Sequence, residues 1–245
     1  MKALTIGFGA VLLVASVAAA QPPAPAGGGQ TPAPPKNLQV LPKDISREQL
    51  LATMAAFTQA LGVNCNYCHV QDRAADDLRT KAAARQMMAL ARDINQKLPQ
   101  AVNKPADQAT RVGCVTCHRG VAIPKQLSDI LLDTEKEKGI DAAVAQYWDL
   151  RKQFFGRAAY DFGEASLITV AQRLTNDTPD AALKVLEINT QFFPGSSRTF
   201  QAMSAAHLKK NDKAEAIKDL EKAAAADPQN PQLKRQLDQL KGASQ

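Results

Sequence analysis

Apolar residues recur at helical spacing from Ser46 to Gly62, which predicts the first helix of the chain. Ser46 is followed three residues later by Gln49, the pattern of a capping box at a helix start. Gly62 can adopt the left-handed backbone that ends many helices, so we expect the helix to stop there. Its apolar stripe consists of Leu50, Met54, Phe57 and Leu61.

A second stripe of the same spacing predicts a second helix over residues 78–98. Pro99 and Pro105 follow it, and we expect them to lie in a loop. The stripe consists of Met87, Leu90, Ile94 and Leu98. The first two helices thus have the same design, an apolar face that carries a methionine.

From about Leu127 onward the chain changes to long, alanine-rich amphipathic runs. Residues 197–228 fit one tetratricopeptide unit, with small and apolar residues at that repeat's packing positions. A degenerate repeat covers residues 163–196, since Pro194 precedes Pro228 by one repeat length. Further helices are expected on either side of this pair, over residues 141–154 and 231–242.

Composition supports a helical chain. Of 245 residues, 45% are hydrophobic and only 5% are aromatic, and alanine is abundant, which favours helices over a β-sandwich. The predicted fold class is therefore all-α. The formal net charge of +6 is spread among mixed acids and bases, so nucleic acid is excluded as a partner.

The N-terminus has the features of an export signal over residues 1–20. Lys2 precedes an apolar run, and Ala18–Ala20 forms a cleavage motif before Gln21. An uncleaved membrane anchor is the alternative interpretation. Residues 21–36 are rich in proline and glycine and are predicted to be a disordered linker.

The chain contains two copies of a Cys-x-x-Cys-His motif, and they hold all four of its cysteines: Cys65, Cys68, Cys114 and Cys117. Two disulfides would be usual in an exported protein, but they leave the adjacent histidines unexplained. A four-thiolate zinc site usually has about 15 to 20 residues between its pairs, whereas 45 separate Cys68 from Cys114. A redox dithiol expects a βα setting, which the chain lacks.

Covalent haem attachment explains all three residues of each motif. Two thiols at i and i+3 on a helical turn lie on one side, where they can form thioethers with the vinyl groups of one porphyrin. His69 and His118, one position further on, can then ligate the iron. Two copies predict two covalently bound haem c groups.

A second axial ligand is expected for each iron, and methionine sulfur is the common one. The candidates are Met54, Met87 and Met88. Consecutive helical residues point about 100° apart, and Met87 is the neighbour that lies on the stripe with Leu90 and Ile94. His207, the third histidine, is interpreted as a packing residue of the repeat region.

With these residues in place, residues 37–124 resemble the cytochrome c subunit of photosynthetic reaction centres, a tetrahaem family. The resemblance rests on "NLQVL", "CNYCH", "ARQMMALARDIN" and "VGCVTCHRGVAIP". It implies that Met54 and His69 ligate the first iron, and that Met87 and His118 ligate the second. The family's third and fourth haem segments are missing here, and so is a histidine after "RDIN".

The predicted organisation therefore has four parts. They are a signal peptide at 1–20, a linker at 21–36, a dihaem cytochrome c domain at 37–125 and a tetratricopeptide-like helical domain at 126–245.

The predicted function is electron transfer by an exported, periplasmic dihaem cytochrome, with membrane association left open. Its partners would be redox proteins, among which the resemblance suggests a membrane-bound or photosynthetic reaction centre complex. The alternative is a dihaem peroxidase or reductase, which needs one open haem. Arg119 is a candidate counter-ion for a haem propionate, with a solvated surface charge as the alternative. The C-terminal repeats could dock a protein partner or serve a structural role.

Overall fold

The computed structural model describes residues 34–242, and every regular element in that range is helical. The all-α prediction is confirmed. The predicted signal peptide and most of the predicted linker lie outside the described residues. A compact unit begins at Lys36.

Helix α1 spans Arg47–Leu61 and begins and ends as its sequence predicts. The Ser46 side chain accepts a hydrogen bond from the backbone N–H of Gln49, whose side chain accepts one from the Ser46 backbone N–H. Gly62 ends the helix with a left-handed φ of 65°. The capping box and the glycine stop are thus both confirmed.

Helix α2 spans Arg79–Ala101 and runs past the proline that was expected to follow it. Pro99 lies inside its last turn, so its placement in a loop was wrong. A proline there removes only one intrahelical hydrogen bond. The turn continues because Val102 N–H donates to the Leu98 carbonyl and Lys104 N–H donates to that of Pro99.

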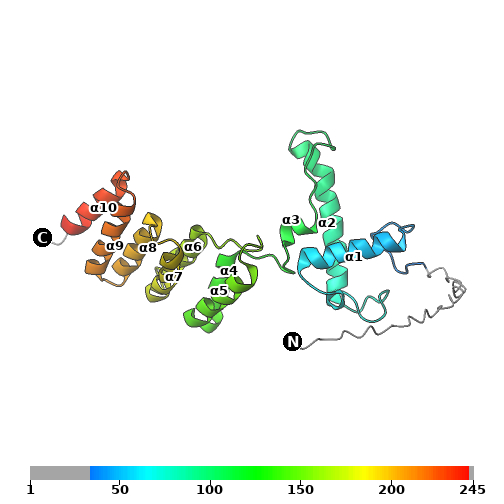
Figure 1. Cartoon of the computed structure of the whole chain (residues 1–245), viewed down its shortest axis with the longest axis horizontal. Coiled ribbons are helices and arrows are strands. Elements are labelled where there is room, and N and C mark those ends of the chain that lie inside the picture. The colour runs from blue at the N-terminus through cyan, green and yellow to red at the C-terminus, as the bar shows by residue number, and fades with distance from the viewer. Residues whose placement is uncertain (1–33, 243–245) are drawn as a thin grey trace, which may run out of the picture. The chain divides into compact units, whose positions relative to one another are not determined.

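Each Cys-x-x-Cys-His motif forms a short helical turn. The first is the 3₁₀ turn η1, Cys65–Tyr67, and the second is helix α3, Cys114–His118. Helix α3 packs on α1 (Figure 1). The backbone N–H of Gly120 donates to the Ala60 carbonyl at 2.8 Å, which ties the end of the second motif to the last turn of α1.

The C-terminal part is a succession of packed helices (Figure 1), in which most pack on the next helix in sequence, while α4 also packs on α6 and α5 on α7. Their bounds are α4 Leu127–Lys138, α5 Ile140–Phe154, α6 Glu164–Leu174, α7 Pro179–Phe192, α8 Ser197–Lys209, α9 Lys213–Ala226 and α10 Pro231–Gly242. The pairs α6/α7 and α8/α9 coincide with the two predicted repeats. Their assignment to the tetratricopeptide class stays a prediction.

The apolar core lies in these C-terminal helices. One cluster joins α4 to α8 and includes Leu127, Tyr147, Leu167 and Leu186, while a smaller one joins α9 to α10. Among described residues up to 125, by contrast, the buried hydrophobic side chains are Ala60 and Val121. Helix α2 buries none of its 23 residues. The N-terminal helices therefore lack a protein core of their own.

Within the described range, no helix combines the length and the apolar character needed to cross a membrane.

Gly62→Ala should destabilise the protein by about 2–4 kcal/mol. A Cβ at this position would lie 2.0 Å from the Gly120 carbonyl oxygen, and the left-handed φ adds backbone strain. Urea unfolding measures the loss. Gly156→Ala is the control, since Gly156 also has a positive φ, of 79°, but an added Cβ there would meet open space. Equal losses for the two variants would show that the contact between Gly62 and Gly120 is unimportant.

Candidate haem-binding site

The four motif cysteines are accessible and none of them forms a disulfide. Cys65 and Cys117 are exposed, while Cys68 and Cys114 are half-buried. Burial raises the pKa of the Cys68 thiol, and a hydrogen bond with Thr80 partly opposes that shift. All four sulfurs are therefore available for covalent attachment.

The two motif histidines are held in the same way. Nδ1 of His69 lies 3.2 Å from the Arg73 carbonyl oxygen, and Nδ1 of His118 lies 3.0 Å from that of Val121. A carbonyl can only accept, so each Nδ1 carries the proton and donates it. This tautomer leaves the Nε2 lone pair of both rings for a metal. The residues present thus suit a haem iron at each motif.

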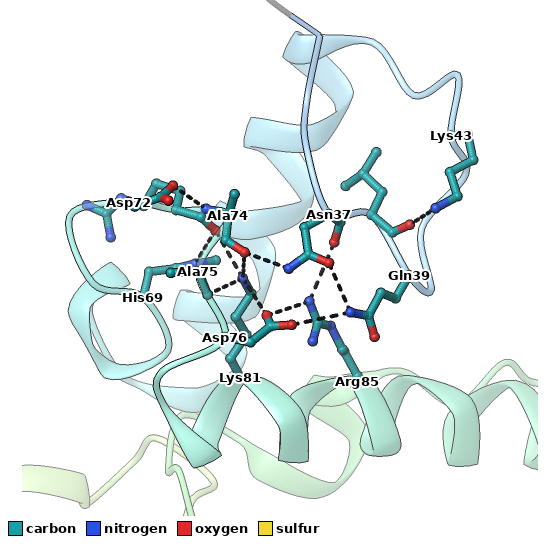
Figure 2. A network of polar contacts seen from close by, with 12 residues as sticks. Asn37, Gln39, Lys43, His69, Asp72, Ala74, Ala75, Asp76, Lys81 and Arg85 are labelled. Atoms are coloured by element: carbon teal, nitrogen blue, oxygen red, sulfur yellow. Dashed lines mark hydrogen bonds and ion pairs between the residues drawn. The ribbon is translucent and has the colours of Figure 1, made fainter.

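A polar network surrounds the loop that follows the first motif (Figure 2). Asp76 accepts from Lys81 at 3.0 Å and from Arg85 at 2.8 Å, both on α2. Gln39 donates to the same carboxylate, and Asn37 donates to the Ala74 carbonyl. These contacts attach the loop to α2 and to the segment before α1.

Electrostatics at this loop are set by its cations. The hydrogen bond from Arg85, helped by Asn37 and Lys81, holds the pKa of the Asp76 carboxyl far below its usual range. Burial and then the Lys81 charge lower the pKa of His69. Both effects favour a neutral imidazole beside an ionised carboxylate.

The segment entering the second motif is held by one side chain of α2. Asn95 donates through Nδ2 to the Val112 carbonyl at 2.8 Å, and its Oδ1 accepts from the Val112 N–H at 2.7 Å. Because both backbone groups of Val112 are satisfied, the chain enters Cys114 at a fixed position relative to α2.

Two cavities border the second motif. One of about 480 Å³ is lined by Val40, Leu41, Met88, Ala91, Arg92, Asn95, Gln96, Arg111, Gly113 and Cys114. The other, of about 530 Å³, contains Cys117, Arg119 and Lys125 together with residues of the loop before α6 and of α6 itself. Each cavity therefore places one motif cysteine near two basic side chains.

The candidate methionines differ in exposure. Met54 is half-buried on α1, and Met88 is half-buried on α2 in the cavity with Cys114. Met87 is 51% exposed, beside an equally exposed Leu90. The α2 stripe is thus about half exposed at these two positions, whereas Met88 is the methionine that lies near Cys114.

The described residues also bear on a metal site formed by side chains alone, without haem. Among residues 34–242, no three His, Cys, Asp or Glu side chains converge as a metal site would require. His207 lies on α8 in the C-terminal part, with Nε2 3.6 Å from Asp219 and Nδ1 3.8 Å from Asp212. It is largely enclosed there, as the packing interpretation expects.

Sequence patterns gave no sign of Asn95, Asp76 or Lys81. These residues form contacts between α2 and loops whose residues lie up to 17 positions away in the sequence. Helical periodicity marks an apolar face but does not identify a polar residue that binds loop backbone. The quoted segment "ARDIN" contains Asn95, and it was the only available signal.

Comparison with known proteins shows the family to which the chain is similar. The family model for the photosynthetic reaction centre cytochrome C subunit matches residues 11–160, more than half of the chain. A reaction center cytochrome c subunit from Thermochromatium tepidum is 41% identical over 93 residues, which is 37% of this chain and 22% of that protein.

Two further relatives each match about a third of this chain or slightly more. Cytochrome c-554 from Chloroflexus aurantiacus is 42% identical over 84 residues, 34% of this chain and 20% of that protein. The reaction center subunit from Rubrivivax gelatinosus is 35% identical over 94 residues, 38% of this chain and 24% of its own. The chain thus spans less than a quarter of these relatives. No solved structure matches.

Asn95→Leu should lower the free energy of unfolding by about 1–3 kcal/mol, because it leaves two partly buried backbone groups of Val112 unpaired. Chemical denaturation measures this change. Gln100→Leu, at an exposed position in the last turn of the same helix, is the control and should change stability little. If both variants lose the same stability, Asn95 does not anchor the second motif.

Proposed function

The chain belongs to the photosynthetic reaction centre cytochrome c subunit family, and on that basis we propose that it is an exported dihaem c-type cytochrome that carries electrons between redox partners. Cys65 and Cys68 would bind the first haem, and Cys114 and Cys117 the second. His69 with Met54, and His118 with Met87, would be the axial ligands.

The observation that carries this proposal is the matched setting of the two histidines. Each donates Nδ1–H to a backbone carbonyl three or four residues later. Such a bond fixes the orientation of the ring and increases the basicity of Nε2. A chance Cys-x-x-Cys-His sequence has no reason to repeat this contact, so two haem sites are the simplest explanation.

Exposed apolar residues of the N-terminal region support the same conclusion. They include Leu51, Tyr67, Met87, Leu90, Val102, Val115 and Ile123. Burial of apolar surface is the main stabilising contribution to a fold, and these side chains have little protein to pack on. Two porphyrins would supply the missing apolar surface.

Charge in this region suits the acidic edges of haem. Residues 36–125 hold 13 of the 30 basic residues and 7 of the 24 acidic ones, so they account for the net charge of the chain. Arg92 and Arg111 line one cavity, and Arg119 and Lys125 line the other. Lys125 is already paired with Asp133 at 2.7 Å. Arg92, Arg111 and Arg119 would bind propionates, whose carboxylates need basic partners when partly desolvated.

A haem bound at each motif would supply one-electron redox chemistry. The chain's part would be to hold both axial ligands and to exclude other ligands from the iron. The Nδ1 contacts would keep His69 and His118 in one orientation during this chemistry.

Partners and location follow from the family and the predicted export signal. We propose a periplasmic protein that exchanges electrons with a redox protein donor and acceptor. A membrane-bound complex, such as a photosynthetic reaction centre, is the candidate acceptor or donor suggested by the names of the relatives. The C-terminal helices α6–α9, proposed to be tetratricopeptide-like, would dock a partner or support the haem region.

The exported protein should carry two haems per chain. Mass spectrometry measures this as two covalent haem additions, and the Cys65→Ala/Cys68→Ala and Cys114→Ala/Cys117→Ala double variants should each retain one. Ferric spectra should be low-spin, with no rapid peroxide consumption. A high-spin haem with fast peroxide turnover would instead establish the peroxidase alternative.

Met87→Leu should abolish the weak methionine-to-iron charge-transfer band of one haem, while Met88→Leu leaves both bands intact. The stripe shared with Leu90 and Ile94 motivates this choice, and the place of Met88 beside Cys114 makes it the necessary control. Absorption spectra of the ferric variants decide between them. The reverse result would assign Met88 as the ligand.

A further inference from the structure

In each motif a backbone carbonyl accepts the Nδ1 proton of the histidine, and the two motifs differ in whether that carbonyl accepts a second hydrogen bond. The Arg73 carbonyl accepts from His69 Nδ1, and it also accepts from Lys81 Nζ at 3.1 Å. At the second motif, the Val121 carbonyl accepts from His118, and within the described residues no cationic side chain is seen to bind it. One axial histidine therefore shares its acceptor with a positive charge, and the other does not.

Lys81 is built into this position. Its side chain is 11% exposed, and Nζ also donates to the carbonyls of Ala74 at 3.1 Å and Ala75 at 2.6 Å. Three consecutive carbonyls and the Asp76 carboxylate thus surround the ammonium group (Figure 2). A side chain with four such contacts is held in place, unlike a solvated surface lysine.

Its charge is only partly neutralised. Asp76 contacts both Lys81 and Arg85, so one carboxylate faces two cations. Asn37 and Gln39 are uncharged, and the charge of Asp72, which accepts from the Ala74 N–H, is offset by that of the adjacent Arg73. The network therefore has one net positive charge close to the His69 side of the first haem site.

A positive charge at this place has a defined effect on an iron bound by His69. Lys81 draws electron density from the Arg73 carbonyl, which weakens its pull on the Nδ1 proton and makes Nε2 a poorer electron donor. It also repels the additional positive charge of ferric iron, and the 11% exposure of its side chain limits screening by water. Both effects favour the ferrous state.

We propose that Lys81 is a positioning residue that raises the reduction potential of the haem bound by His69 and so makes the two haems unequal. The inference rests on the proposed dihaem function. The contact of Lys81 with the Arg73 carbonyl raises the reduction potential of this haem. The negative charge of Asp76 limits that increase. An electron arriving at the second haem is thereby favoured to move to the first.

Spectroelectrochemical titration of the purified dihaem protein tests this proposal, because it resolves two one-electron components. In Lys81→Met, the reduction potential of one component should fall by about 59 mV. This corresponds to a decrease of about tenfold in the ratio of reduced to oxidised haem at a fixed applied potential. The other component should not move. Lys81→Arg, which keeps the charge, should retain most of the original potential. Met54→Leu identifies the first haem, since it removes the methionine proposed for it.

Asp76→Asn provides a second variant with the opposite sign. Removing the carboxylate leaves two uncompensated cations, so the same component should become easier to reduce. A network that only maintained local order would shift the potential in one direction for both variants. Lys97→Met is the matched control, because Lys97 lies exposed on the same helix and its loss removes the same charge.

The proposal is overturned if Lys81→Met leaves both components unchanged, if Lys97→Met has the same effect, or if Lys81→Met and Asp76→Asn shift the potential alike. Failure of the proposed function has a different appearance. In that case the unmodified protein would carry fewer than two haems, or would contain a high-spin iron, before any variant is compared.

Discussion

Burial of apolar surface is the constraint on which this molecule depends, and its two parts meet it differently. Helices α4–α10 pack on one another around side chains such as Tyr147 and Leu186. Helices α1 and α2 carry equally regular apolar stripes, yet α2 has no buried residue. Their order in the isolated chain comes from polar contacts and close backbone packing. A covalently bound porphyrin would give the N-terminal region the apolar surface that the hydrophobic core gives helices α4–α10.

Those polar contacts converge on loops that a haem protein has to hold still. Asp76 joins the loop after the first motif to α2, and Asn95 joins the segment before the second motif to the same helix. Helix α2 therefore serves both sites: one end organises the surroundings of His69, and its middle positions the entry to Cys114. Polar contacts with both loops thus give a helix of 23 residues without a buried side chain a structural role.

Local signals in the sequence predicted most of the helices and motifs, but they did not predict the contacts that connect the loops to α2. The capping box of Ser46 and the stop at Gly62 depend on adjacent residues alone, so they could be predicted. The continuation of α2 through Pro99 could not, because one missing hydrogen bond is a small cost that the following turn offsets. The motifs predicted the cysteines and histidines as haem-binding residues, and this assignment stays a prediction. The contacts of Asn95 and Lys81 with distant backbone depend on how loops return to α2, for which no periodic pattern exists.

The close approach of Gly62 and Gly120 has a consequence for the distance over which electrons would tunnel. Gly62 lies three residues before Cys65, and Gly120 lies two residues after His118. The two motifs are thus joined through a main-chain contact and a hydrogen bond from Gly120 to Ala60. This contact between the motifs is made by main-chain atoms, not by a large side chain. Because tunnelling rates fall steeply with separation, a backbone contact of this kind would favour a short path between the two proposed haems.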